Sequence, residues 1–229
     1  MSSEQSPLGA GAALRSASLA DLAHQELHRR IADGALAEGE RLVIDRLARE
    51  FATSLNPVRE ALARLHAERL VTFERNKGYR VAPKPSPIEL QQLFEARLIL
   101  EIGAVEQGLR HITEEALAEL AAINRNIAQR RYGTTFEGFH DFVRFNEQFH
   151  VLLVGLCRNP FIIEAYNHLG YHQQIMHSHH GRGVPDIERI VSEHEAIIET
   201  LRGSEPAAVR EAIRRHILGG ATRLGLEAG

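Results

Sequence analysis

Three prolines at alternate positions, Pro83, Pro85 and Pro87, divide this 229-residue chain into two stretches with different residue patterns. Proline fixes its φ angle and has no backbone N–H to donate, so such a run forms a short, stiff connection. A hairpin-like stretch lies directly before it, at residues 70–82, and the chain after it has a helical pattern throughout. We therefore predict a linker at 83–86 between two regions of different architecture.

The region before the linker reads as two long helices, a short helix between them and a hairpin. Leu19, Ala23, Leu27 and Ile31 recur every four residues and predict a first helix over about 18–32. The other elements are expected at 44–51, from 54–56 to 69, and at 70–82. This order is typical of a winged helix-turn-helix over residues 18–82. Residues 1–17, rich in Ser, Ala and Gly, are expected to form a disordered tail.

The region after the linker, residues 87–226, is predicted to be an all-helical antiparallel bundle, so the fold class is mainly α. Ser86, Pro87 and Glu89 form a capping-box pattern with proline at the first helical position. The expected helices cover 87–108, 113–131, 136–158, 160–180, 186–202 and 205–226.

Composition excludes several classes of protein. The single cysteine, Cys157, permits no intrachain disulfide and no cysteine-based zinc site, which favours a reducing compartment and a cytoplasmic protein. No run of eighteen apolar residues is present, so no membrane span is expected. The formal net charge is −3, yet residues 41–80 hold nine Lys and Arg against five Asp and Glu. This local excess of positive charge favours a nucleic-acid-binding half.

A helix-turn-helix places the first turn of its second helix in the major groove of DNA. Here that turn presents Ser54, Asn56 and Arg59, of which Arg59 suits guanine or phosphate and Asn56 suits adenine or a helix cap. The other basic candidates are Arg46, Arg49, Arg75 and Lys77. The first two are expected to bind phosphates, and the last two lie at the hairpin tip, where a minor groove or the backbone is in reach. Spacing alone leaves open a solvated basic face without DNA.

Four positions in the second region suggest a metal site. Asn146 and His150 are four residues apart on one helix, and His194 and His216 lie on two later helices. A bundle can bring such helices together around one internal point, and neutral imidazole binds Zn, Ni, Cu or Fe. The alternative is a set of separate core or surface histidines without a ligand.

The segment Asn56-Pro57-Val58-Arg59-Glu60-Ala61-Leu62-Ala63-Arg64-Leu65, followed by Gly78-Tyr79-Arg80-Val81, resembles the GntR superfamily of bacterial regulators. The resemblance covers about residues 18–82. It implies that the position of Leu55 often carries an arginine that contacts bases. Leu55 removes that contact, so the operator preference of relatives does not transfer to this chain.

The second region resembles the FCD effector domain of the FadR-like branch of that superfamily. The segments that carry this resemblance are Asn146-Glu147-Gln148-Phe149-His150, Asn159-Pro160, Glu193-His194-Glu195-Ala196-Ile197 and Arg215-His216-Ile217. The resemblance implies a dimerising bundle of six or seven helices that binds a divalent metal through one Asp and three His. His150, His194 and His216 match the imidazoles, and Asn146 replaces the Asp. We expect zinc, with nickel as the alternative, at an affinity lowered by Asn146.

The same resemblance implies an effector pocket above the metal that takes a small carboxylate. Arg97 matches a pocket arginine of the family, and Arg144, Tyr171 and His172 are further candidates for its wall. For Arg97 the alternative is an ion pair with Glu101, one helical turn away. The run His177-Ser178-His179-His180 is interpreted as a helix end rather than a metal patch.

Three functions are therefore weighed. The first is a ligand-controlled homodimer, a repressor that binds a pseudo-palindromic operator. The second is a metallohydrolase, which the absence of a His-Glu-x-x-His motif disfavours. In addition, Glu147 points elsewhere on the helix than Asn146, and Glu193 and Glu195 flank His194 on other faces. The third is an interaction module without a ligand.

Overall fold

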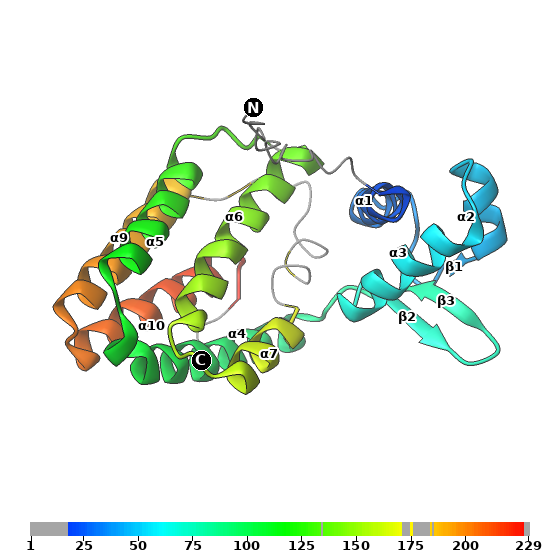
Figure 1. Cartoon of the computed structure of the whole chain (residues 1–229). Helices are drawn as coiled ribbons and strands as arrows, with labels where there is room; N and C mark the ends of the chain where they lie inside the picture. The colour runs from blue at the N-terminus through cyan, green and yellow to red at the C-terminus, as the bar shows by residue number, and fades with distance from the viewer. Residues whose placement is uncertain (1–17, 134, 171–174, 176–183, 185, 227–229) are drawn as a thin grey trace, which may run out of the picture.

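The computed structural model of the chain describes residues 18–133, 135–170, 175, 184 and 186–226. A small winged-helix unit lies at one end and a larger set of long helices at the other, as Figure 1 shows. Each has its own hydrophobic core. The predicted mainly α class is confirmed, and the expected tail at 1–17 lies outside the described residues.

The first unit consists of α1 (Leu19–Ala32), β1 (Arg41–Leu42), α2 (Ile44–Glu50), α3 (Leu55–Ala67), β2 (Val71–Glu74) and β3 (Gly78–Val81). Ser18 caps α1 in a capping box with Asp21, which fixes where the helix begins. The predicted stripe of α1 is buried at Ala23, Leu27 and Ile31, and α1 packs against α3. Amphipathic periodicity thus produced the three helices where they were expected.

The strands form an antiparallel sheet in the order β1-β3-β2. In the hairpin, Val71 pairs with Val81 and Glu74 with Gly78. Asn76 and Gly78 adopt left-handed backbone angles, with φ of 69° and 81°, which close the turn. Strand β1 was not predicted, because two residues are too short to show the alternation of a strand.

The second unit contains α4 (Pro87–Gly108), a 3-10 turn η1 (Leu109–His111), α5 (Glu114–Ala128), α6 (Phe136–Gly155), α7 (Pro160–His168), α9 (Ile187–Gly203) and α10 (Pro206–Arg223). The capping box of Ser86 and Glu89 is formed, and Asn159 caps α7 through its side-chain oxygen. Helix α7 ends earlier than the predicted 160–180 segment, because Gly170 turns into the left-handed region at φ 59°. The rest of that segment lies almost entirely outside the described residues.

Helices α4, α5, α6, α9 and α10 enclose the main core of this unit. Helix α4 contacts both α6 and α10, and α9 contacts both α5 and α10. At Gly108 the segment that ends α6 approaches so closely that a Cβ atom would lie 2.7 Å from the backbone of Leu156. The inward side chains of these five helices pack against one another in this core. Within the described part of the chain, no helix combines the length and the apolar character that crossing a membrane requires.

Candidate metal centre and DNA-binding surface

Three histidines from three helices meet in the interior of the second unit. His150 lies on α6, His194 on α9 and His216 on α10, with exposed fractions of 0%, 0% and 5%. One ring nitrogen of each lies within 4.8 Å of the others. The structure therefore brings together the three imidazoles that the sequence analysis singled out.

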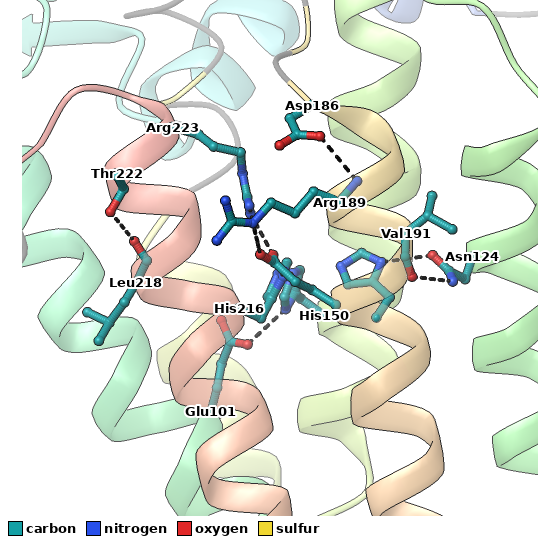
Figure 2. A network of polar contacts seen from close by, with 12 residues as sticks. Glu101, Asn124, His150, Asp186, Arg189, Val191, His216, Leu218, Thr222 and Arg223 are labelled. Carbon is teal, nitrogen blue, oxygen red and sulfur yellow. Dashed lines mark hydrogen bonds and ion pairs between the residues drawn. The ribbon is translucent and has the colours of Figure 1, made fainter.

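Each imidazole bonds through Nδ1 to an oxygen outside the cluster. The acceptors are Oε2 of Glu101 for His150 (2.8 Å), Oδ1 of Asn124 for His194 (3.1 Å) and Oε2 of Glu193 for His216 (3.0 Å). Figure 2 shows Glu101, Asn124 and Arg223 around these rings. An ionised carboxylate only accepts, and Asn124 already donates its amide N–H to the carbonyl of Val191 at 3.0 Å. The hydrogen of each ring is therefore assigned to Nδ1.

With Nδ1 protonated, Nε2 of all three rings carries a lone pair. Nε2 of His150 and Nε2 of His216 lie only 3.1 Å apart. Nε2 of His194 is buried and has no hydrogen-bond partner among the described residues. Two acceptors facing each other repel unless a proton or a cation lies between them. Two nitrogens bound to one tetrahedral zinc at about 2.0–2.1 Å lie about 3.3 Å apart, close to the observed separation, so the residues fit a transition metal.

Burial keeps these rings neutral. Removal from water lowers the pKa of all three imidazoles, well below the usual value for His194 and to about 4 for His216. Neutral imidazole is the form that binds a metal.

The two carboxylates behind the rings stay ionised. For Glu193, burial raises the pKa, but hydrogen bonds from His216 and Arg223 lower it more, to about 2. Burial also raises the pKa of Glu101, but the charge of Arg97 and the hydrogen bonds from His150 and Arg97 outweigh it, so the net shift is downward.

Asn146 precedes His150 by one helical turn on α6 and is buried, with 8% exposed. It lines a cavity of about 60 Å³ together with His216. The cavity wall also contains Arg97, Phe139, Phe142, Ile175, Ile190, Gly220, Arg223 and Leu224. A mostly apolar wall with a few polar groups is typical of a small-molecule site.

Arg97 forms the predicted ion pair and also lines the cavity. Its Nε donates to Oε1 of Glu101 at 2.7 Å, and its Nη2 lies 3.3 Å from both ring nitrogens of His150. The two interpretations of Arg97 are therefore compatible. Tyr166 adds a hydrogen bond from its hydroxyl to Glu101 at 3.2 Å.

The other effector candidates are not brought to the cavity. The side chain of Arg144 is 47% exposed, contacts Asp141 at 3.5 Å and stacks over the ring of Phe145. It faces outward because it lies on a different face of α6 from Asn146 and His150. Tyr171, His172 and the His177–His180 run lie outside the described residues.

Four polar residues of the site were not predicted as part of it: Glu101, Asn124, Glu193 and Arg223. Arg223 forms two hydrogen bonds with Glu193, at 2.9 and 2.8 Å. Its place was recoverable, since it follows His216 by seven residues and so lies on the same face of α10. Glu193 points away from His194, as expected, and accepts a hydrogen bond from His216 instead.

The predicted DNA-contacting side chains are displayed on the surface of the first unit. Ser54, Asn56 and Arg59 are exposed at the start of α3, and Leu55 is half-buried against the core of this unit. Exposed side chains also include Arg46, Arg49, Arg75 and Lys77. Arg46 forms an ion pair with Glu40 at 3.2 Å, which is loose enough to exchange for a phosphate.

Known protein families match both units. A model of the FCD domain matches residues 92–219, and a model described as bacterial regulatory proteins, gntR family, matches residues 19–81. The uncharacterized HTH-type transcriptional regulator YdhC of Bacillus subtilis is 26% identical over 204 residues, covering 85% of this chain and 84% of that protein. The HTH-type transcriptional repressor GlaR of Escherichia coli is 27% identical over 190 residues, covering 81% and 86%.

A solved structure has the same fold. The E. coli McbR/YncC structure superposes with a TM-score of 0.69 at 20% identity, covering 92% of this chain and 98% of that one.

Proposed function

This chain belongs to the GntR family of bacterial transcriptional regulators and carries an FCD domain, and from that premise we propose that it is a metal-dependent repressor released from its operator by a small carboxylate. Like its relatives, it is a transcriptional regulator and not an enzyme. The relatives named repressors include GlaR and the gluconate operon transcriptional repressor of Bacillus licheniformis, which supports repression as the sign of regulation.

The observation that carries this proposal is the convergence of three buried Nε2 atoms whose Nδ1 partners are all in place. We propose that His150, His194 and His216 hold a divalent transition metal, zinc or nickel, with Asn146 as a fourth donor. Oxygen acceptors on Nδ1 orient metal-bound imidazoles and raise their basicity, so this outer set supports a metal site. When bound, the metal supplies a cation that attracts an anionic effector.

The effector site is the cavity beside the cluster. Arg97 and Arg223 line it and offer planar guanidinium groups, which suit a carboxylate. Its volume of about 60 Å³ restricts the effector to a small molecule.

DNA binding is assigned to residues 18–82, joined by the linker 83–86 to the effector domain at 87–226. Arg59, Asn56 and Ser54 are proposed to read bases or phosphates, and Arg46, Arg49, Arg75 and Lys77 to fix the backbone and the minor groove. We propose a cytoplasmic homodimer on a pseudo-palindromic operator, because a symmetric dimer places two recognition helices about one DNA turn apart. Effector binding would bias the bundle between two arrangements and change that spacing.

Electrophoretic mobility shifts on the DNA upstream of the chain's own gene test this proposal. The zinc-loaded protein should bind one segment in preference to random DNA, with affinity that falls as salt rises, and a carboxylate should release it. Binding that is equal on random DNA, or that no carboxylate changes at any metal content, would contradict the proposal.

A further inference from the structure

The proposed metal site has a donor set without formal charge. The three imidazoles donate as neutral rings, and the Asn146 side chain is a neutral amide. A divalent cation held by these groups would therefore keep both of its positive charges. The net charge of the effector then matters more than it would in a site where a carboxylate binds the metal.

The charged groups around the cavity cancel one another. Arg97 pairs with Glu101 at 2.7 Å, and Arg223 pairs with Glu193 at 2.8 Å. Arg189 also reaches Glu193, at 3.1 Å, but 62% of its side chain is exposed, so solvent screens its charge. Among the described residues, the two guanidiniums and two carboxylates therefore leave the metal charge uncompensated.

That charge would lie among buried side chains. The side chains of His150 and Glu101 are 0% exposed, and that of Arg97 is 2% exposed. Burying an uncompensated charge is strongly unfavourable, and water in a small cavity compensates it only in part. A ligand that carries two negative charges would supply the compensation that the donor set lacks.

We propose that the effector is a small dianion, a dicarboxylate, whose two negative charges balance the metal while its carboxylates face Arg97 and Arg223. This inference rests on the proposed function and narrows its effector class. Both guanidiniums line the cavity, so both ends of such a molecule meet a cation. A volume of about 60 Å³ admits about four to six water-sized units, which favours a chain of very few carbons.

The test compares two probes that differ by one charge and hardly in shape. Malonate carries two carboxylates, and malonamate carries an amide in place of one of them. Isothermal titration calorimetry on the zinc-loaded full chain should show malonate binding at least about tenfold more tightly than malonamate. Inorganic phosphate serves as a third probe, because it is a dianion without a carboxylate. Zinc content is measured after each titration to exclude removal of the metal by the probe.

A variant adds the missing negative charge to the proposed metal ligands. Asn146→Asp adds a carboxylate of nearly the same shape, so the preference for malonate over malonamate should fall by about tenfold while zinc affinity rises. The matched control is Gln148→Glu, which adds the same charge at an exposed position of α6 outside the cavity and should leave the preference unchanged.

The outcomes separate this inference from the function on which it rests. Equal affinity for malonate and malonamate, in protein that holds zinc and binds its operator, would overturn the dianion while leaving the regulator intact. Phosphate binding more tightly than malonate would also overturn the dicarboxylate. Protein that retains no zinc after loading would contradict the metal site itself, and this inference with it. If Asn146→Asp does not fold, the comparison of the probes on the unmodified chain still decides.

Discussion

The two units use their polar side chains in opposite directions. The winged-helix unit buries a small apolar core and displays Arg59, Asn56 and Ser54 outward, where DNA can approach them. The helical unit turns its most important polar side chains inward, and His150 and His194 are fully buried. An outward site depends on which residues a helix turn carries. The inward site depends on contacts between residues far apart in the sequence, so its polar groups form one connected network.

The largest effect is expected when one of the buried metal-binding histidines is removed. His194→Ala should lower zinc affinity by more than about 100-fold, since a first ligand matters more than the outer contacts that cost 10–100-fold. Elemental analysis after dialysis against a weak chelator measures the retained metal. The matched control is His168→Ala on α7, an exposed histidine that should leave the metal content unchanged. Full retention of zinc by the His194 variant would mean that the metal binds elsewhere.

The inward site should also make the metal-free protein sensitive to acid. The pKa of His216 falls from 6.5 to about 4 on folding, so the unfolded chain binds more protons between these values. Stability is therefore full above about pH 6.5 and is lost as the pH falls toward 4, by on the order of 3 kcal/mol for this residue. Burial lowers the pKa of His150 and His194 in the same direction. Urea unfolding at pH 7 and at pH 4.5 measures this loss of stability. A free energy of unfolding that is the same at both pH values would refute the prediction.

A smaller effect is expected when an oxygen acceptor behind one of the metal-binding rings is removed. Asn124 is not a proposed metal ligand, but its Oδ1 accepts a hydrogen bond from Nδ1 of His194 at 3.1 Å. Asn124→Ala should lower zinc affinity by about 10–100-fold, because the ring loses the acceptor that fixes its tautomer. Competition with a fluorescent zinc chelator measures this affinity. If the variant binds zinc as tightly as the unmodified chain, the contact is structural only.

The outward site should tolerate removal of a side chain without any effect on the metal. Arg59→Ala should weaken operator binding by about 1–3 kcal/mol and leave the zinc content unchanged. The control is Arg202→Ala, an exposed arginine at the end of α9 that forms an ion pair with Glu199 one turn earlier. Fluorescence anisotropy with labelled operator DNA compares the two variants. A similar loss in both would indicate a general charge effect and no specific role for Arg59.

The sequence predicted the architecture well because the signals for it are local. Ser18 and Ser86 cap their helices as their neighbours indicate, and Gly170 ends α7 where the helical pattern alone continues. The outer contacts of the metal site lie far apart along the chain: Glu101 is 49 residues from His150, and Asn124 is 70 residues from His194. Only the packing of helices joins such residues. Helical spacing therefore indicated the ligands but not the groups that orient them.

Anomalous diffraction at the zinc absorption edge, on crystals of the zinc-loaded chain, tests the central claim most directly. The account predicts one strong peak per chain, bounded by Nε2 of His150, His194 and His216, with Nδ1 of each ring still on its oxygen acceptor. A map without a peak at this point, from crystals whose zinc content is one per chain, would contradict it.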